Sequence, residues 1–122
     1  MNPRKILIVD DELSILVSLK FLLEKNHFDV ELAQSGREAL ENIARSKPDL
    51  ILLDIMLPDL DGYEIFQVIR RRPEWDDIKV IYLTARSRDL DIAKGLNLGA
   101  DAYITKPFSN ALLLEKIGLL LK

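Results

Sequence analysis

The 122-residue sequence contains no cysteine and only one histidine. Without cysteine, neither disulfide bonds nor thiolate chemistry are available, which is compatible with a reducing cytoplasm. No apolar run approaches the roughly 20 residues that a membrane-spanning helix needs, and the first residues lead straight into a short apolar segment without a signal-peptide pattern. The lone His27 is expected on the surface at a helix end. These absences favour a cytoplasmic protein that does not enter a membrane.

The sequence also has no excess of positive charge. The 17 lysine and arginine residues are outnumbered by 20 aspartate and glutamate residues, which gives a net charge of −3. This balance argues against direct nucleic-acid binding by the chain. Hydrophobic residues make up 48% of the sequence, and neither a repeat nor a linker interrupts it. We therefore expect one globular domain over residues 1–122.

Five short apolar segments predict β-strands. They are Lys5–Val9, Asp29–Ala33, Leu50–Leu53, Lys79–Leu83 and Ala102–Ile104. The first, third and fourth are almost continuously apolar, as is typical of parallel strands that helices cover on both faces. The segments between the strands have helical length and apolar residues at three- and four-residue spacing. The first of these stripes is Leu13, Leu16, Leu19 and Leu23.

This alternation predicts five strands and five helices, an α/β fold of the (βα)5 type. The segment Ser35–Glu38 predicts a capping box at the start of the second helix, and Ser109 is a candidate N-cap of the last. We expect a doubly wound, flavodoxin-like sandwich with a five-stranded parallel sheet in the order 2-1-3-4-5 and helices on both faces. In such folds, function is concentrated at the carboxyl ends of the strands.

Polar residues stand directly after the apolar strands. They are Asp10 and Asp11 after the first strand, Asp54 after the third, Thr84 after the fourth and Lys106 after the fifth. Three neighbouring carboxylates repel one another unless a cation lies among them, and Mg²⁺ prefers such oxygen ligands. Lys106 offers a positive charge and Thr84 a hydroxyl to a phosphate group. The pattern predicts Mg²⁺-assisted phosphoryl transfer to the carboxylate of Asp54.

Together, the stretches KILIVDDE, LDIMLPDLDGYE and GADAYITKPF resemble the response-regulator receiver domain of two-component signalling, with its chemotaxis-regulator-like fold. The resemblance covers essentially the full chain. It implies that Asp54 is the phosphoacceptor and that Lys106 contacts the phosphoryl group. It also implies a Mg²⁺ site made of Asp10, Asp11, Asp54 and the backbone carbonyl of Met56.

The resemblance further implies a two-state switch. Thr84 and Tyr103 would rearrange when Asp54 is phosphorylated, although Tyr103 has a second interpretation as an ordinary packing residue of a strand. The peptide bond from Lys106 to Pro107 would be cis, and Gly62 would permit a tight turn after Asp54. In the family, the output is conveyed by the face that the fourth helix, fifth strand and fifth helix form.

The same resemblance implies partners. A histidine kinase or histidine phosphotransfer protein would donate the phosphoryl group, and a downstream effector domain or target would receive the signal. The chain is thus expected to be a signalling receiver and not an enzyme, although it assists its own phosphorylation and slow dephosphorylation. In the family, the rate of dephosphorylation depends on Met56 and Arg86.

The last helix carries more apolar residues than one buried stripe can use, so some should face solvent or a partner. They are Ala111, Leu112, Leu113, Leu114, Ile117, Leu119, Leu120 and Leu121. Self-association of this face, as in a homodimer, is one hypothesis. Its first turn lacks the acid that receivers of winged-helix transcription factors usually carry, which leaves Asp101 and Lys116 as candidates for an ion pair.

Three other functions are compatible with the same fold. A flavin- or nucleotide-binding module is disfavoured because no phosphate-cradling loop follows the first strand, where acids stand instead. An aspartate-nucleophile phosphatase is disfavoured because Met56 occupies the place of a second acid two residues after Asp54. A receiver that has lost phosphorylation is disfavoured by the intact set of acids.

Overall fold

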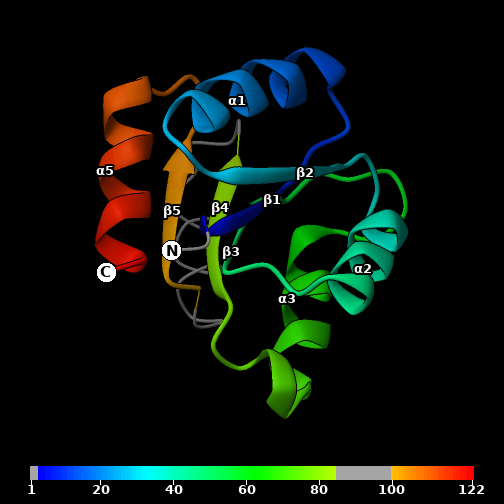
Figure 1. Cartoon of the computed structure of the whole chain (residues 1–122). Coiled ribbons are helices and arrows are strands. Elements are labelled where there is room, and N and C mark those ends of the chain that lie inside the picture. Colours follow the sequence, from blue (N-terminus) through cyan, green and yellow to red (C-terminus); the bar gives the residue numbers. More distant parts are fainter. Residues whose placement is uncertain (1–2, 85–99) are drawn as a thin grey trace.

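The computed structural model describes residues 3–84 and 100–122 and shows a parallel sheet between two layers of helices (Figure 1). The strands are β1 (Lys5–Val9), β2 (Asp29–Ala33), β3 (Leu50–Asp54), β4 (Lys79–Thr84) and β5 (Ala102–Thr105). Their order is β2-β1-β3-β4-β5, and every neighbouring pair is parallel. The predicted fold class and strand order are therefore confirmed. The expected fourth helix lies outside the described residues.

Three strands run one residue further than their apolar segments. Asp54, which ends β3, pairs with Leu83 of β4, and Thr84, which ends β4, pairs with Thr105 of β5. Backbone pairing depends on main-chain groups alone, so it continues into polar residues that a hydrophobic pattern excludes. The extra residues are those that stand at the expected functional edge.

Helices α1 (Leu13–Lys25) and α5 (Asn110–Leu120) cover one face of the sheet, and α2 (Gly36–Arg45) and α3 (Gly62–Arg71) cover the other (Figure 1). A short 3₁₀ helix, Pro73–Trp75, follows α3. Alternate residues of each strand serve the two cores, as the twofold period of a strand requires. In β1, for example, Leu7 packs with α2 and α3, whereas Ile8 packs with α1 and α5.

The helix starts agree only in part with the predicted caps. Ser35 accepts a hydrogen bond from the N–H of Glu38, which is one half of the predicted capping box. Ser109 caps α5 as predicted, through the N–H of Leu112. A complete capping box stands at α3, where Asp61 and Glu64 exchange both bonds. That box matches the same sequence pattern but was not among the predictions.

Two surface predictions are confirmed. His27 lies just past the end of α1, exposed and with a φ of 71°. On α5, Leu113 and Ile117 are buried, whereas Leu112 and Leu119 are 40% and 60% exposed, so the apolar surface of this helix does exceed its buried stripe. Within residues 3–84 and 100–122, no helix has the length and hydrophobicity needed to cross a bilayer.

Candidate functional site

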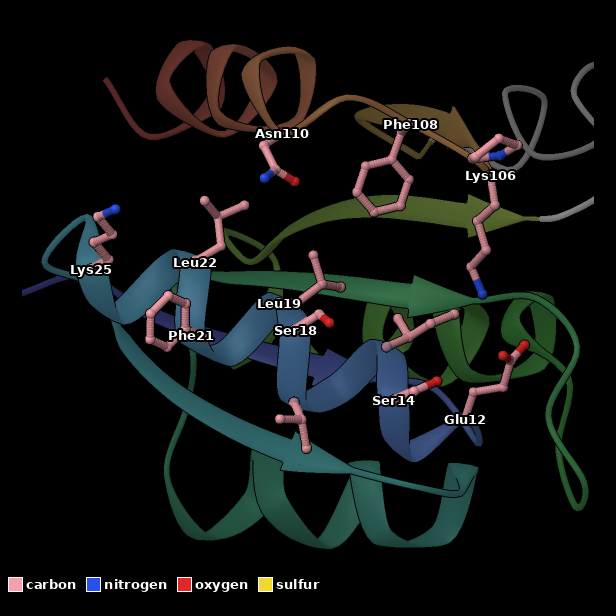
Figure 2. Close-up of a pocket in the computed structure, with 13 residues that line it drawn as sticks. Glu12, Ser14, Ser18, Leu19, Phe21, Leu22, Lys25, Lys106, Phe108 and Asn110 are labelled. Atoms are coloured by element: carbon pink, nitrogen blue, oxygen red, sulfur yellow. The ribbon is translucent and has the colours of Figure 1, made fainter.

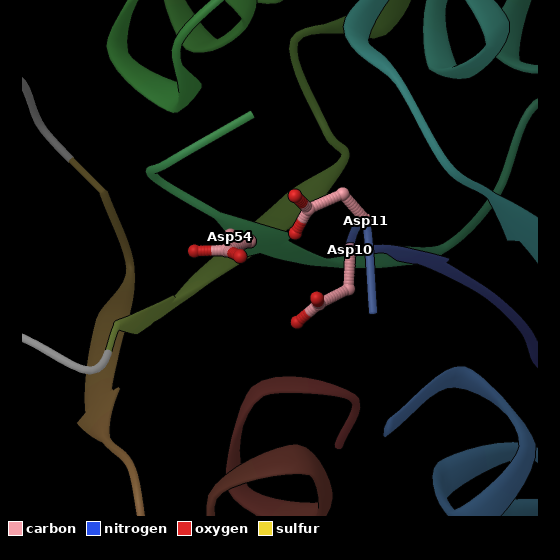
Figure 3. Close-up of side chains that lie close together, drawn as sticks. All are labelled: Asp10, Asp11 and Asp54. Carbon is pink, nitrogen blue, oxygen red and sulfur yellow. The ribbon is translucent and has the colours of Figure 1, made fainter. Parts of the chain in front are cut away.

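The three predicted acids meet at the carboxyl ends of β1 and β3 (Figure 3). These strands are neighbours, so Asp10, directly after β1, and Asp54, the last residue of β3, lie side by side. One carboxylate oxygen from each of Asp10, Asp11 and Asp54 lies within 4.8 Å of the others. Asp10 and Asp54 are buried and Asp11 is exposed. The cluster is therefore open to water on one side.

Backbone groups hold the two buried carboxylates in place. One oxygen of Asp10 accepts the N–H of Glu12 at 2.9 Å, and one oxygen of Asp54 accepts the N–H of Met56 at 3.1 Å. In both cases the donor stands two residues further along the chain, a local bond typical of aspartate at the end of a strand. The second oxygen of each side chain faces the ammonium of Lys106.

Lys106 provides the positive charge opposite these acids. Its ammonium donates to Asp10 Oδ2 at 2.7 Å and lies 3.5 Å from Asp54 Oδ2. Burial lowers the pKa of Lys106, but the hydrogen bond to Asp10 and the negative charges of Asp54 and Asp10 outweigh it and leave the pKa above its usual value. Lys106 therefore stays protonated and ties the loop after β5 to β1 and β3.

The carboxyl group of Asp54 is electrostatically strained. Burial raises its pKa from 3.8 to about 6, the charge of Asp10 adds to the rise, and Lys106 and the N–H of Met56 oppose it. A carboxylate with such a pKa is still mostly ionised at neutral pH. Its negative charge is nevertheless costly there, so an additional cation would stabilise it.

The donor set fits Mg²⁺. Three acids against one lysine leave a net charge of about −2 at the cluster. Mg²⁺ is a hard cation that binds one or two carboxylates and completes its shell with waters and phosphate oxygens. The exposed side at Asp11 leaves room for those further ligands. Met56, whose carbonyl is the fourth expected ligand, follows in the loop after β3 and is tied to Asp54 through its own N–H.

The structure describes only some of the remaining predicted site residues. Thr84 ends β4 beside β5, but its side chain, like Ala85 and Arg86, lies outside what the structure describes. Tyr103 pairs with Tyr82 across β4 and β5 and is half-buried against the core under α2 and α3. The Lys106–Pro107 peptide bond is cis. The switch roles of Thr84 and Tyr103 stay predictions.

Gly62 is required for a different reason from the one expected. Its N–H donates to the carbonyl of Ile55 at 2.8 Å and closes the loop after β3. A Cβ atom at Gly62 would lie 2.8 Å from the carbonyl oxygen of Asp54 and 2.8 Å from Cα of Ile55. Close approach to the backbone of the site, and not a special turn conformation, therefore excludes a side chain here.

A groove opens beside the cluster, between α1 and the connection from β5 to α5 (Figure 2). Its volume is about 1110 Å³, Glu12 and Lys106 stand at the end nearest the acids, and Leu19 and Phe108 line its middle. No sequence pattern indicated this groove. Leu13 belongs to the predicted apolar stripe of α1, but it is 61% exposed, whereas the other members, Leu16, Leu19 and Leu23, are buried.

The exposure of Leu13 has a simple geometric cause. Leu13, Val17 and Phe21 recur every four residues and form a second apolar stripe on α1, exposed to solvent.

The partner of Asp101 also differs from the candidate Lys116. Asp101 accepts hydrogen bonds from the N–H of Val80 and from Arg70 of α3, so its carboxylate is engaged within the domain.

Comparison with known proteins gives consistent results. The model of the response regulator receiver domain matches residues 6–118. The alkaline phosphatase synthesis transcriptional regulatory protein PhoP of Bacillus subtilis is 47% identical over 106 residues, covering 87% of this chain and 43% of that protein. Response regulator MprA of Mycolicibacterium vanbaalenii is 43% identical over 120 residues, covering 98% of this chain and 51% of that protein.

Solved structures agree in fold as well as in sequence. A receiver domain protein from Methanospirillum hungatei is 40% identical, with a TM-score of 0.89 and coverage of 98% of this chain and 94% of that one. By contrast, the chain spans about half the length of the curated relatives it matches.

Proposed function

Because the chain belongs to the response regulator receiver domain family of two-component systems, we propose that it is a switch activated by phosphorylation of Asp54. The observation that carries the proposal is the buried Asp54 carboxylate, which lies between two further acids and a protonated lysine. Residues 1–122 form one receiver domain in this proposal. Its role is signalling, so it modifies no substrate other than itself.

The chemistry follows from the charges of the site. An oxygen of Asp54 forms a bond to phosphorus while the bond from phosphorus to the donor nitrogen breaks, and the donor imidazole takes up a proton. Lys106 neutralises oxygens of the transferred group, and the Thr84 hydroxyl donates to the same group. Asp10, Asp11, Asp54 and the Met56 carbonyl would hold Mg²⁺, which would supply the remaining positive charge.

The partners are a histidine kinase or a histidine phosphotransfer protein on the input side and an effector domain or target on the output side. The phosphorylated state changes the face of α5, β5 and the fourth helix, through Thr84 and Tyr103. Leu112 and Leu119 give α5 apolar surface for such contacts, including those of a homodimer. We place the protein in the cytoplasm, with no direct contact between this domain and nucleic acid or membrane.

The test is to phosphorylate the purified chain with acetyl phosphate and record its intact mass with and without Mg²⁺. We expect one added phosphoryl group that requires Mg²⁺, is released by hydroxylamine and is absent from the Asp54→Asn variant. Asp49→Asn, which removes an acid at the opposite end of the sheet, is the matched control and should be phosphorylated normally. An adduct that persists in Asp54→Asn, or no adduct under any condition, contradicts the proposal.

A further inference from the structure

The loop between β3 and α3, residues 55–61, contains Met56, whose backbone carbonyl is the expected fourth ligand of the metal site. At its base, the N–H of Gly62 bonds the carbonyl of Ile55, and the N–H of Met56 bonds Asp54. Met56 is exposed, so the loop has little packing over this residue. Leu57 and Leu60 pack against the core, so polar contacts of the far part of the loop add to this packing in holding the Met56 carbonyl.

Asp59 makes the polar contact between the far part of this loop and α2. Its Oδ1 accepts the N–H of Gly36 at 2.8 Å and its Oδ2 accepts the N–H of Arg37 at 2.9 Å. These are the first two residues of α2, whose N–H groups have no partner within the helix. Ser35 satisfies the third, Glu38. An acid from a loop 23 residues away thus completes the cap of α2.

The pairing is strong and closely fitted. The two N–H groups, that of Arg37 foremost, hold the pKa of the exposed Asp59 down at about 2. Asp59 is therefore charged at neutral pH. A Cβ atom at Gly36 would lie 2.8 Å from Cβ of Leu60, the residue after Asp59. The loop reaches α2 this closely only because residue 36 has no side chain.

We propose that Asp59 is a positioning residue for the magnesium site, which it serves by fastening the loop that carries the Met56 carbonyl to the first turn of α2. The inference rests on the proposed function, because it concerns the same metal site. It goes beyond that function in giving a role to an exposed acid that lies outside the cluster of Asp10, Asp11 and Asp54. The fastening acts at the two N–H groups of α2 and needs no contact between Asp59 and the metal.

The test is the Mg²⁺ affinity of the purified chain, measured by isothermal titration calorimetry below the melting temperature of every variant. Asp59→Ala removes both acceptors, and we expect its dissociation constant to rise about tenfold, the lower end of the range for groups that orient metal ligands. Asp59→Asn keeps one acceptor oxygen and should lose less. Amide hydrogen exchange without Mg²⁺ should be faster at Gly36 and Arg37 in Asp59→Ala.

Asp77→Ala is the matched control. It also removes one exposed carboxylate with a lowered pKa, but the partner of that carboxylate is Lys47 and not the backbone of α2. Its Mg²⁺ affinity should stay within about twofold of the unmodified chain, because exposed charges that are far apart are screened by salt.

Gly36→Ala tests the same contact from the helix side. Its new Cβ should push Leu60 and the loop away while Asp59 remains intact, and Mg²⁺ affinity should again fall. The loss in the double variant with Asp59→Ala should be smaller than the sum of the two single losses, because both substitutions break one contact. Additive losses would overturn the proposal.

A cap with a purely structural role gives a different result. Asp59→Ala would then melt at a lower temperature but bind Mg²⁺ as tightly as Asp77→Ala, which overturns the inference. Failure of the proposed function is distinguishable: the unmodified chain would bind Mg²⁺ and yet gain no phosphoryl group on Asp54. Failure of the positioning role alone leaves the unmodified chain phosphorylated normally.

Discussion

The two ends of the parallel sheet both carry charged side chains, but their charges are balanced differently. At the amino end, Glu31 lies 2.9 Å from Lys5 and 3.6 Å from Arg45, and Asp49 lies 3.9 Å from Arg4. In these three pairs, two acids face three bases, and all five side chains are at least partly exposed. This end is neutralised by its own residues.

Among the described residues at the carboxyl end, three acids face a single lysine, and the two buried acids, Asp10 and Asp54, share it. Water cannot screen these charges as it screens those of the amino end. The difference separates charges that are paired within the domain, at the amino end, from charges that lack sufficient partners there, at the carboxyl end. A surplus of about two negative charges in a buried cluster is what a divalent cation would neutralise.

The largest expected effect is a gain in stability from Asp54→Asn. The rise in the pKa of Asp54 from 3.8 to about 6 corresponds to about 3 kcal/mol. Below pH 4 the carboxyl is protonated in the folded and unfolded states alike. Between pH 4 and pH 6 the unfolded state releases its proton first, so stability falls as pH rises, and the full cost remains at pH 7.

Urea unfolding without Mg²⁺ measures this effect. We expect the free energy of unfolding of Asp54→Asn to exceed that of the unmodified chain by about 3 kcal/mol at pH 7, a difference that vanishes toward pH 4. Glu31→Gln is the control at the amino end and should lose about 1 kcal/mol or less, because it breaks partly exposed ion pairs. If Asp54→Asn and Glu31→Gln both lower the free energy of unfolding, the expected difference between the two ends is contradicted.

The second effect is stabilisation by Mg²⁺ itself. At 100 times its dissociation constant, a ligand that binds only the folded state adds about 2.7 kcal/mol. We expect this gain in the unmodified chain and in Asp49→Asn, but not in Asp11→Asn. Thermal melting with and without Mg²⁺ is sufficient to measure it. An equal gain in all three proteins would mean that the ion binds elsewhere.

The smallest effect is expected for Arg4→Ala at the amino end. The ion pair of Arg4 with Asp49 is long and exposed, so its loss should change the free energy of unfolding by less than about 0.5 kcal/mol. Asp49 also accepts the N–H of Lys5 at 2.8 Å, a bond that this substitution leaves intact. Urea unfolding at low and high salt measures the change. A loss of more than about 1 kcal/mol in the free energy of unfolding would show that this ion pair contributes more than its geometry indicates.

Most of the fold was predictable because it depends on hydrophobic periodicity. Strands β1 and β2 begin and end at the predicted residues, whereas β3, β4 and β5 each gain one polar residue from backbone pairing. The meeting of Asp10, Asp11, Asp54 and Lys106 was predictable too, since the carboxyl ends of neighbouring parallel strands share one edge.

What could not be predicted depends on contacts between distant residues. Nothing in the local sequence shows that Asp59 reaches the first turn of α2, or that Asp101 binds Arg70 and not Lys116. The exposure of Leu13 was missed because both stripes of α1 have helical spacing, and only packing against the sheet separates them. The Asp61–Glu64 box, in contrast, was readable from its spacing alone.

The acids of the site stand directly after β1 and at the end of β3. Like β4, these strands have almost completely buried apolar residues and a hydrogen-bonded neighbour on each side. Amides in such strands exchange with solvent only when the whole domain unfolds, whereas exposed loops exchange through small local openings. Asp10 and Asp54 are therefore held in place for as long as the domain is folded. If the loop with Met56 opens locally within that period, a bound Mg²⁺ would exchange without any disturbance of the sheet.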